Sequence, residues 1–175
     1  MPDRTRLERF EQALLPHLNA AHNLARWLVR NESDAQDLTQ EAYLRALTFF
    51  DSFRGEDARA WLLKIVRNTC YTFLHQNRKH ELAAAFDEEI HSGESGGGDP
   101  EAPALRNADR RLLKEALEEL PAEFREIVVL RELEELSYKE IAEVANLPIG
   151  TVMSRLARAR RRLEQALARR MGTGS

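Results

Sequence analysis

The stretch LSYKEIAEVANLPIGTVMSRLARARRRL, residues 136–163, decides the fold of the chain's second half. It opens on residues 137–140 (SYKE), a capping-box pattern in which the serine and the glutamate each satisfy a backbone N–H of the other. A short amphipathic helix follows, residues 146–148 (NLP) end it, and a longer helix begins at Gly150. A short helix, a tight turn and a longer helix together predict a helix-turn-helix.

The longer helix has separate apolar and basic faces. Its inward stripe consists of Val152, Leu156, Ala159, Leu163 and Leu167. The first residues of such a helix reach base edges in a DNA major groove, and later arginines meet phosphates. The pattern favours DNA binding over the simpler interpretation, a solvated basic face. The candidate DNA contacts are Thr151, Ser154, Arg155 and Arg158 at the bases and Arg161 and Arg162 at phosphates.

Helical spacing continues upstream of this motif. It predicts a helix over residues 110–120 and another that begins at Pro121, because proline at the first helical position loses no intrahelical hydrogen bond. The expected buried residues of that second helix are Phe124, Ile127, Val128 and Leu130. The second half is therefore predicted to hold four helices.

Three helices are predicted in the first half. Apolar residues at helical spacing from Leu7 to Leu28 predict a single long helix. Residues 33–36 (SDAQ) match a capping box that opens the second helix. The expected apolar face of that helix is Leu38, Ala42, Ala46 and Phe49. A third helix begins near Ala58 and fades at the polar run 75–81.

The segment SGESGGGDPEAP, residues 92–103, separates the two halves. Its glycines, serines, prolines and acids leave almost nothing to bury, which predicts a flexible linker. We therefore expect an all-α chain of two small helical domains, residues 1–80 and 109–175, joined by a flexible acidic linker over 81–108.

Composition excludes several classes of protein. The 175 residues are 43% hydrophobic and 31% charged, which is typical of a globular chain. No apolar run approaches the roughly 18 residues of a membrane span, and the charged N-terminus does not match a secretory signal. A single cysteine, Cys70, leaves no intrachain disulfide and no cysteine cluster for zinc. A cytoplasmic protein without membrane insertion is expected.

Charge is unevenly distributed along the chain. The formal net charge is -3, yet residues 148–175 carry seven arginines and one glutamate, and residues 54–79 carry six basic and two acidic residues. Residues 81–109 carry eight acidic residues and one arginine. Two basic segments therefore flank an acidic one, a pattern compatible with nucleic-acid binding.

The third helix of the first half offers a second candidate surface. Lys64, Arg67, Asn68 and Tyr71 recur at helical spacing, and Phe53 and Arg54 lie in the loop before them. Basic residues interleaved with aromatic rings and an amide suit single-stranded nucleic acid, because cations follow phosphates while rings cradle unstacked bases. The alternative is that the rings pack internally, and for Trp61 we favour that alternative.

The second helix has an acidic edge formed by Asp34, Asp37, Gln40 and Glu41. A solvated face is the default interpretation, and a metal site ranks lowest because no histidine lies nearby. Catalysis finds little support: the chain lacks a glycine-rich phosphate loop and the HExxH and GxSxG motifs. Cys70 lies on an apolar helix face, which predicts a buried, inert thiol. We expect no enzyme, no metal and no cofactor.

Taken together, these residues resemble a sigma factor of the extracytoplasmic-function (ECF) group within the sigma-70 family. DAQDLTQEAYLRAL, residues 34–47, resembles the region-2 segment that docks on RNA polymerase. FRGEDARAWLLKIVRNTC, residues 53–70, resembles the segment that melts and reads the promoter -10 element. Residues 120–163 resemble the region-4 helix-turn-helix that reads the -35 element.

The resemblance implies a role for each candidate residue. Asp34, Asp37, Gln40 and Glu41 would contact the β′ clamp helices of bacterial core RNA polymerase. Phe53 and Arg54, with Lys64, Arg67, Asn68 and Tyr71, would hold the -10 strand. The -35 contacts would be Lys139, Thr151, Ser154, Arg155, Arg158 and Arg162. Met153 departs from the family, in which many members carry arginine at that place.

The resemblance also implies further partners. Region 4 would contact the polymerase β flap, the acidic linker would follow the basic RNA-exit region, and a cognate anti-sigma factor would hold the protein inactive.

Two alternatives stay open from the residues alone. One is a self-sufficient helix-turn-helix regulator that binds duplex DNA as a dimer. The other is a nucleic-acid enzyme with Asp34, Asp37 and Glu41 as metal ligands.

Overall fold

The computed structural model describes residues 2–55, 57–84 and 104–172. Every regular element in these ranges is a helix, which confirms the all-α prediction. The chain forms two compact units that divide between residues 93 and 94, with residues 143–146 described here together with the helix to which they belong. No helix in the described ranges is both long and apolar enough to cross a membrane.

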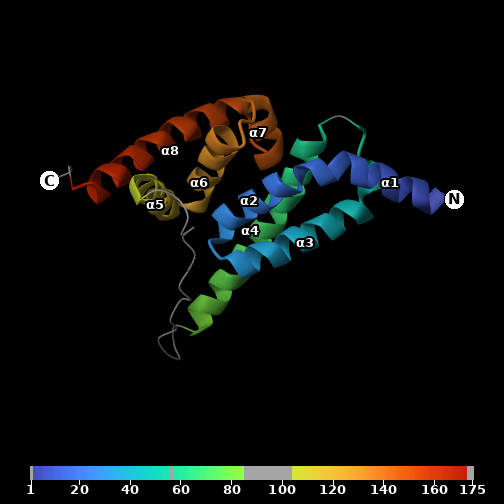
Figure 1. Ribbon diagram of the computed structural model, residues 1–175, viewed down its shortest axis with the longest axis horizontal. Helices are drawn as coiled ribbons and strands as arrows, with labels where there is room; N and C mark the ends of the chain where they lie inside the picture. Colours follow the sequence, from blue (N-terminus) through green and yellow to red (C-terminus); the bar gives the residue numbers. More distant parts are fainter. Residues whose placement is uncertain (1, 56, 85–103, 173–175) are drawn as a thin grey trace. The chain divides into compact units, whose positions relative to one another are not determined.

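The described residues of the first unit form four α-helices. Helices α2, α3 and α4 pack against one another (Figure 1). Its elements are α1 (Pro2–Leu14), η1 (Leu15–His17), α2 (Leu18–Val29), α3 (Glu32–Thr48), η2 (Phe50–Ser52) and α4 (Ala58–Ala84). Alanines fill much of the contact, because small side chains let helices approach closely. The fully buried core includes Phe10, Leu14, Leu24, Leu28, Ala35, Ala42, Leu62, Leu63 and Val66.

The single long helix predicted over residues 7–28 is wrong. The 3₁₀ turn Leu15–His17 divides it into α1 and α2. Pro16 explains the break, because its ring excludes the preceding turn and it has no N–H to donate. The division also leaves Leu7 44% exposed, although its spacing predicted burial.

The start and the end of α3 also differ from the sequence prediction. Asn31, not Ser33, caps the helix: its Oδ1 accepts from the backbone N–H of Asp34 at 2.9 Å. At the other end, Phe49 is 60% exposed while Phe50 is buried. The chain leaves the helix at Phe49 and enters η2, so Phe50 takes the core position that the periodicity assigned to its neighbour.

Asp57 caps α4, which begins at Ala58 as the sequence predicts. The Oδ1 atom of Asp57 accepts from the backbone N–H of Ala60 at 3.0 Å. Gly55 precedes the cap with φ 79°, a left-handed conformation that favours glycine. The helix continues to Ala84, beyond the polar run that was expected to end it. Cys70 is buried on its inner face, as predicted.

The second unit contains the helix-turn-helix. Its elements are α5 (Ala104–Glu119), α6 (Ala122–Val128), a π-helical turn η3 (Val129–Leu133), α7 (Tyr138–Ala145) and α8 (Ile149–Arg170). Helix α8 packs against α5 and α6. Since α4 ends at Ala84 and α5 begins at Ala104, both ends of the predicted linker are helical, and residues 85–103 lie outside the described ranges.

The capping box of α7 forms as predicted. The backbone N–H of Glu140 donates to Ser137 Oγ at 3.1 Å, and that of Ser137 donates to Glu140 Oε1 at 2.9 Å. The preceding π-helical turn ends at Leu133 with Glu134 as its C-cap, and Glu135 follows with φ 57°. Pro121 and Pro148 are the N-caps of α6 and α8, one residue before each helix begins.

Candidate functional site

The acidic edge lies along the outer side of α3. Asp37, Gln40 and Glu41 are exposed and Asp34 is half-buried. The opposite side of the helix carries the buried residues Ala35, Leu38, Ala42 and Ala46. Glu41 forms an exposed ion pair with Arg45 at 3.2 Å, which contributes little to stability. The edge is therefore a negatively charged surface on a well-packed helix.

Leu44 lies on this same side of α3, and the sequence analysis missed it. Its side chain is 58% exposed. It follows Glu41 by three residues and Gln40 by four, so it continues the acidic edge by one helical turn. Its position outside the buried stripe of α3 was the available signal. A single exposed leucine is ordinary on a protein surface, so its relevance here comes from its place next to the acidic edge.

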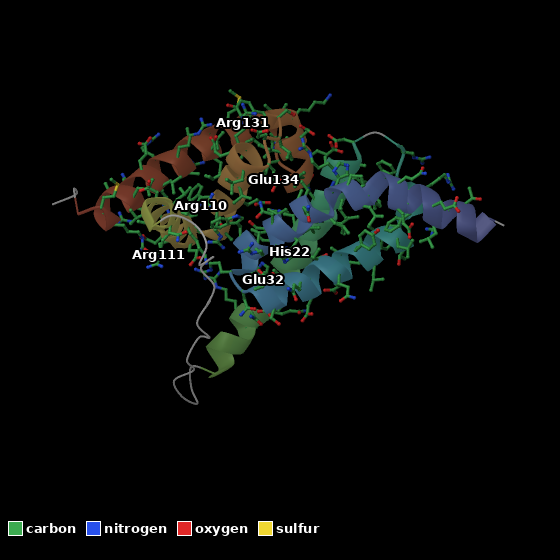
Figure 2. The ribbon with its side chains drawn as sticks, in the orientation of Figure 1. His22, Glu32, Arg110, Arg111, Arg131 and Glu134 are labelled. Carbon is green, nitrogen blue, oxygen red and sulfur yellow. The ribbon has the colours of Figure 1, made fainter. Side chains whose placement is uncertain are left out.

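Helix α2 contacts the start of α3 through Glu32. Its Oε2 atom lies 2.9 Å from Arg26 Nε. The Nε2 atom of His22 is sealed from solvent and lies 3.0 Å from Glu32 Oε1, although no hydrogen bond of good geometry joins the two. Figure 2 labels His22 and Glu32, which come from these two helices. The position of the acidic edge therefore depends on the packing of α3 against α2 and α4, to which these contacts of the exposed Glu32 side chain add little.

The acidic edge does not gather into a metal site. Among the described residues, no group of three histidine, cysteine, aspartate or glutamate side chains is placed to hold a metal ion. Asp34, Asp37 and Glu41 instead follow one another along the helix surface. This arrangement favours contact with an extended basic partner over chelation of a cation.

The polar face of α4 brings together the basic, amide and aromatic residues that the sequence predicted. Asn68 is exposed, while Lys64, Arg67 and Tyr71 are half-buried. The Arg67 guanidinium lies 4.1 Å from the centroid of the Tyr71 ring, a cation–π contact that covers one side of the ring. The face therefore combines a fixed ring, a free amide edge and positive charge.

Phe53 packs beside this face rather than projecting from it. Its ring centroid lies 5.8 Å from that of Phe50 and 5.1 Å from that of Trp61. Trp61 also contacts Phe50 edge-on at 6.4 Å, so its predicted packing role is confirmed. The aromatic cluster fixes the loop against the first turn of α4, and Arg54 is exposed at its end. Half-burial leaves part of Phe53 accessible to a ligand.

Helix α8 presents the predicted DNA-binding residues at its N-terminal half. Ser154 and Arg158 are exposed, and Thr151 and Arg155 are half-buried. Ser154 Oγ donates to the carbonyl of Thr151 at 3.2 Å. Within the described residues, neither Arg155 nor Arg158 has an acidic partner, so both guanidinium groups are available to phosphates or bases. Lys139 is exposed in the first turn of α7.

Two other arginines of α8 contribute to packing. Arg160 Nε donates to Glu132 Oε1 at 3.0 Å, and this hydrogen bond raises the pKa of Arg160. The guanidinium of Arg162 lies 4.7 Å from the centroid of Phe124, although its side chain stays exposed. These contacts join α8 to the helices that precede it.

Arg131 supports the turn before α7. Its guanidinium lies 4.6 Å from the centroid of Tyr138, and its Nη1 donates to the carbonyl of Leu136 at 2.9 Å. Figure 2 labels Arg131. Together with the Arg160–Glu132 pair, this contact fixes the path of the chain into the helix-turn-helix.

Comparison with known families gives two matches. Residues 14–80 match the family described as Sigma-70 region 2, and residues 110–163 match Sigma-70, region 4. The chain is 37% identical over 147 residues to the ECF RNA polymerase sigma-E factor of Escherichia coli K12, covering 78% of this chain and 77% of that one. It is 33% identical over 165 residues to the RNA polymerase sigma-H factor of Pseudomonas aeruginosa PAO1, covering 90% and 86%.

Solved structures give a similar result. The sigma factor RpoE of Bartonella quintana, in complex with the anti-sigma factor NepR, matches with a TM-score of 0.72 and 32% identity, over 91% of this chain and 97% of that one. CnrH, in complex with the cytosolic domain of CnrY, matches with a TM-score of 0.65 and 26% identity, over 92% and 88%.

Proposed function

The chain belongs to the ECF sigma factors of the sigma-70 family, and from this premise we propose which of its surfaces perform each step of promoter recognition. Members of the family are non-catalytic subunits that bind core RNA polymerase and promoter DNA. This chain accordingly directs promoter-specific transcription initiation. We propose that it has no catalytic activity of its own and acts in the cytoplasm.

The two units divide the task. In this proposal, residues 1–80 dock on core polymerase and open the -10 element, residues 109–175 read the -35 element and contact the β flap, and residues 81–108 connect them. The family matches, which fall at residues 14–80 and 110–163, support this division.

The acidic edge of α3 is the proposed docking surface for the basic β′ clamp helices. Asp34, Asp37, Gln40 and Glu41 supply charge and hydrogen-bond acceptors, and Leu44 supplies an apolar contact at the end of the edge. Interface energy concentrates in a few well-desolvated contacts, with charge contributing to rate and specificity. The extended arrangement of the carboxylates on one exposed helix side is the observation that supports this assignment.

The polar face of α4 is the proposed site for the unpaired -10 strand. Lys64, Arg67 and Arg54 would neutralise phosphates, while the Asn68 amide hydrogen-bonds an exposed base edge. Tyr71 and Phe53 provide ring surface for an unstacked base. Capture of such a base offsets part of the unpairing cost, which is a few kcal/mol.

The N-terminal half of α8 is the proposed reader of the -35 major groove. Thr151, Ser154, Arg155 and Arg158 would approach base edges, with Lys139 and Arg162 at phosphates. The observation that carries the whole proposal is the presence of this exposed recognition helix and of the acidic edge in one chain. A self-sufficient duplex regulator accounts for only the first of them.

We propose that a cognate anti-sigma factor also binds this chain. The support is that RpoE, which shares its fold, was solved in complex with the anti-sigma factor NepR. CnrH, which also shares the fold, was solved in complex with the cytosolic domain of CnrY. Co-purification of the chain from its native cells, followed by identification of the bound protein, tests this point.

The docking surface is tested by reconstitution with core polymerase. Asp37→Arg reverses a charge on the acidic edge, so we expect it to abolish association with the core enzyme. Glu8→Arg makes the same charge change on an exposed residue of α1 and should leave association intact. Equal co-purification of the two variants would refute the assignment.

A further inference from the structure

Two exposed apolar side chains lie at the start of the recognition helix. Ile149 is 46% exposed and Met153 is 51% exposed. They are four residues apart in α8, so they lie next to each other on the same side of the helix. Scattered single apolar residues on a surface are ordinary, but this pair forms a continuous apolar strip next to the proposed -35 contacts.

The strip borders the polar reading surface. Ser154 follows Met153 directly, and helical spacing places Thr151 and Arg155 on the far side of Ser154. A Cβ built on Gly150, which lies between Ile149 and Thr151 in the first turn of α8, would meet nothing within 4 Å. A helix that enters the major groove has the duplex on more than one of its sides, so a duplex seated on Ser154 also comes within reach of Met153.

We infer that Met153 and Ile149 read the 5-methyl group of a thymine in the -35 major groove. The 5-methyl group of thymine is the one apolar group that an unmodified base pair presents in that groove. Neither side chain has a strong donor or acceptor, so neither can distinguish guanine, adenine or cytosine by hydrogen bonds. Methionine is unbranched and adapts its shape to such a contact.

Charge favours DNA over a protein as the occupant of this strip. The N-terminal half of α8 carries Arg155 and Arg158, which have no acidic partner among the described residues, and Lys139 is exposed on the preceding helix. The positive charges can bind the phosphates of the DNA backbone, while the apolar strip between them contacts the methyl group of a base. The inference rests on the proposed -35 role of α8.

The test uses holoenzyme assembled from core polymerase and the full chain on a promoter defined by transcript mapping. Each thymine of the -35 element is replaced in turn by uracil, which keeps the base pair and removes only the methyl group. Loss of one buried methyl group should lower promoter affinity about fourfold at one position. With Met153→Ala the same replacement should change affinity less than about twofold.

Met171→Ala is the matched control. Met171 is 60% exposed just after the other end of α8, so its truncation should preserve the full uracil effect. Ile149→Ala should reduce the effect partially. Circular dichroism of each variant checks that the helices are retained.

The outcomes separate this inference from the proposed function. A parent holoenzyme indifferent to every uracil, or a -35 element without thymine, overturns the inference. So does a Met153→Ala variant that weakens association with core polymerase and keeps the uracil effect. If Arg158→Ala still weakens use of the -35 element, the proposed function survives that result. If neither Arg158→Ala nor any change of the -35 sequence alters promoter affinity or transcription, the proposed function itself fails.

Discussion

Asn68 and Tyr71 share the polar face of α4, and within the described part of the chain a neighbouring side chain fixes Tyr71 but not Asn68. The Arg67 guanidinium covers the Tyr71 ring, whereas the Asn68 side chain is exposed. An exposed amide contributes little to folding, since water satisfies it equally well in the unfolded chain. A substitution of Asn68 should therefore affect the proposed DNA contact without affecting folding, whereas a substitution of Tyr71 should also remove its contact with Arg67.

Asn68→Ala should impair promoter opening without loss of stability. Removal of one hydrogen bond to an unpaired base should lower the open fraction about five- to tenfold, corresponding to about 1–1.5 kcal/mol. Permanganate reactivity of unpaired thymines near -10 measures this fraction. Gln76→Ala, an exposed amide two turns later in α4, should keep full reactivity. Equal reactivity of the two variants would remove Asn68 from the proposed site.

Caps and ion pairs determine where the helices begin and how they are joined. Asn31 and Asp57 cap the two helices that carry the proposed docking and strand-binding surfaces, and the Ser137–Glu140 box caps the first helix of the helix-turn-helix. Each cap satisfies a backbone donor that the helix leaves unpaired.

Asn31→Ala should destabilise the first unit by about 1 kcal/mol, whereas Ser33→Ala should cost less than about 0.5 kcal/mol. Ser33 lies inside α3, so its hydroxyl is not needed as a cap. Both tryptophans of the chain, Trp27 and Trp61, lie in the first unit, so urea unfolding followed by fluorescence reports on it. If Ser33→Ala lowered the free energy of unfolding more than Asn31→Ala does, Ser33 and not Asn31 would be the cap of α3.

The end of α8 is held to α5 by charge. Arg169 and Arg170 donate to Glu119 at 3.1 and 2.6 Å, and Arg170 also pairs with Glu115 at 2.8 Å. The hydrogen bonds from Arg169 and Arg170 lower the pKa of Glu119. Because the carboxylate is favoured in the folded state, its contribution is present above the unfolded pKa and is lost as pH falls through the folded value.

Glu119→Gln should therefore lower stability at neutral pH and lose its effect in acid. The difference from the parent chain should shrink as pH falls below about 4.3, the ordinary range of a glutamate. Urea unfolding followed by circular dichroism at a series of pH values measures this difference in the free energy of unfolding. Glu164→Gln, an exposed glutamate of α8, serves as the control and should shift stability little at any pH. A pH-independent difference for Glu119→Gln would argue against the ion-pair origin.

At the scale of the whole molecule, the proposed function depends on linking two DNA-binding units that are each weak on their own. A single DNA-binding module buries only about 600–1,000 Å² of its surface, which limits the specificity of each unit alone. Covalent connection and a shared polymerase raise the effective concentration of one reader once the other is bound. Neither unit needs tight promoter binding by itself.

Cleavage of the connection should expose this dependence. A protease site inserted between residues 93 and 94, cut after holoenzyme assembly, should lower promoter affinity at least about tenfold. Association of residues 1–93 with core polymerase should remain. The uncut insertion variant is the control, and full affinity after cutting would show that polymerase contacts alone hold both units in place.

Much of the fold followed from local patterns in the sequence. The capping box at Ser137, the spacing of Val152, Leu156 and Ala159, and the start of α4 depend on neighbours within one or two helical turns, and all three match the structure. The acidic edge and the polar face of α4 were also found, because helical spacing by itself places residues on one side.

Tertiary packing decided the remainder. Periodicity could not tell that Phe50 enters the core and Phe49 stays exposed, or that Phe53 packs against both Phe50 and Trp61. Those outcomes depend on how η2 returns toward α4. The exposure of Leu44, Ile149 and Met153 likewise depends on which helix sides find partners. Sequence sets the faces of each helix through a fixed geometric period, whereas burial requires contacts between segments distant in the chain.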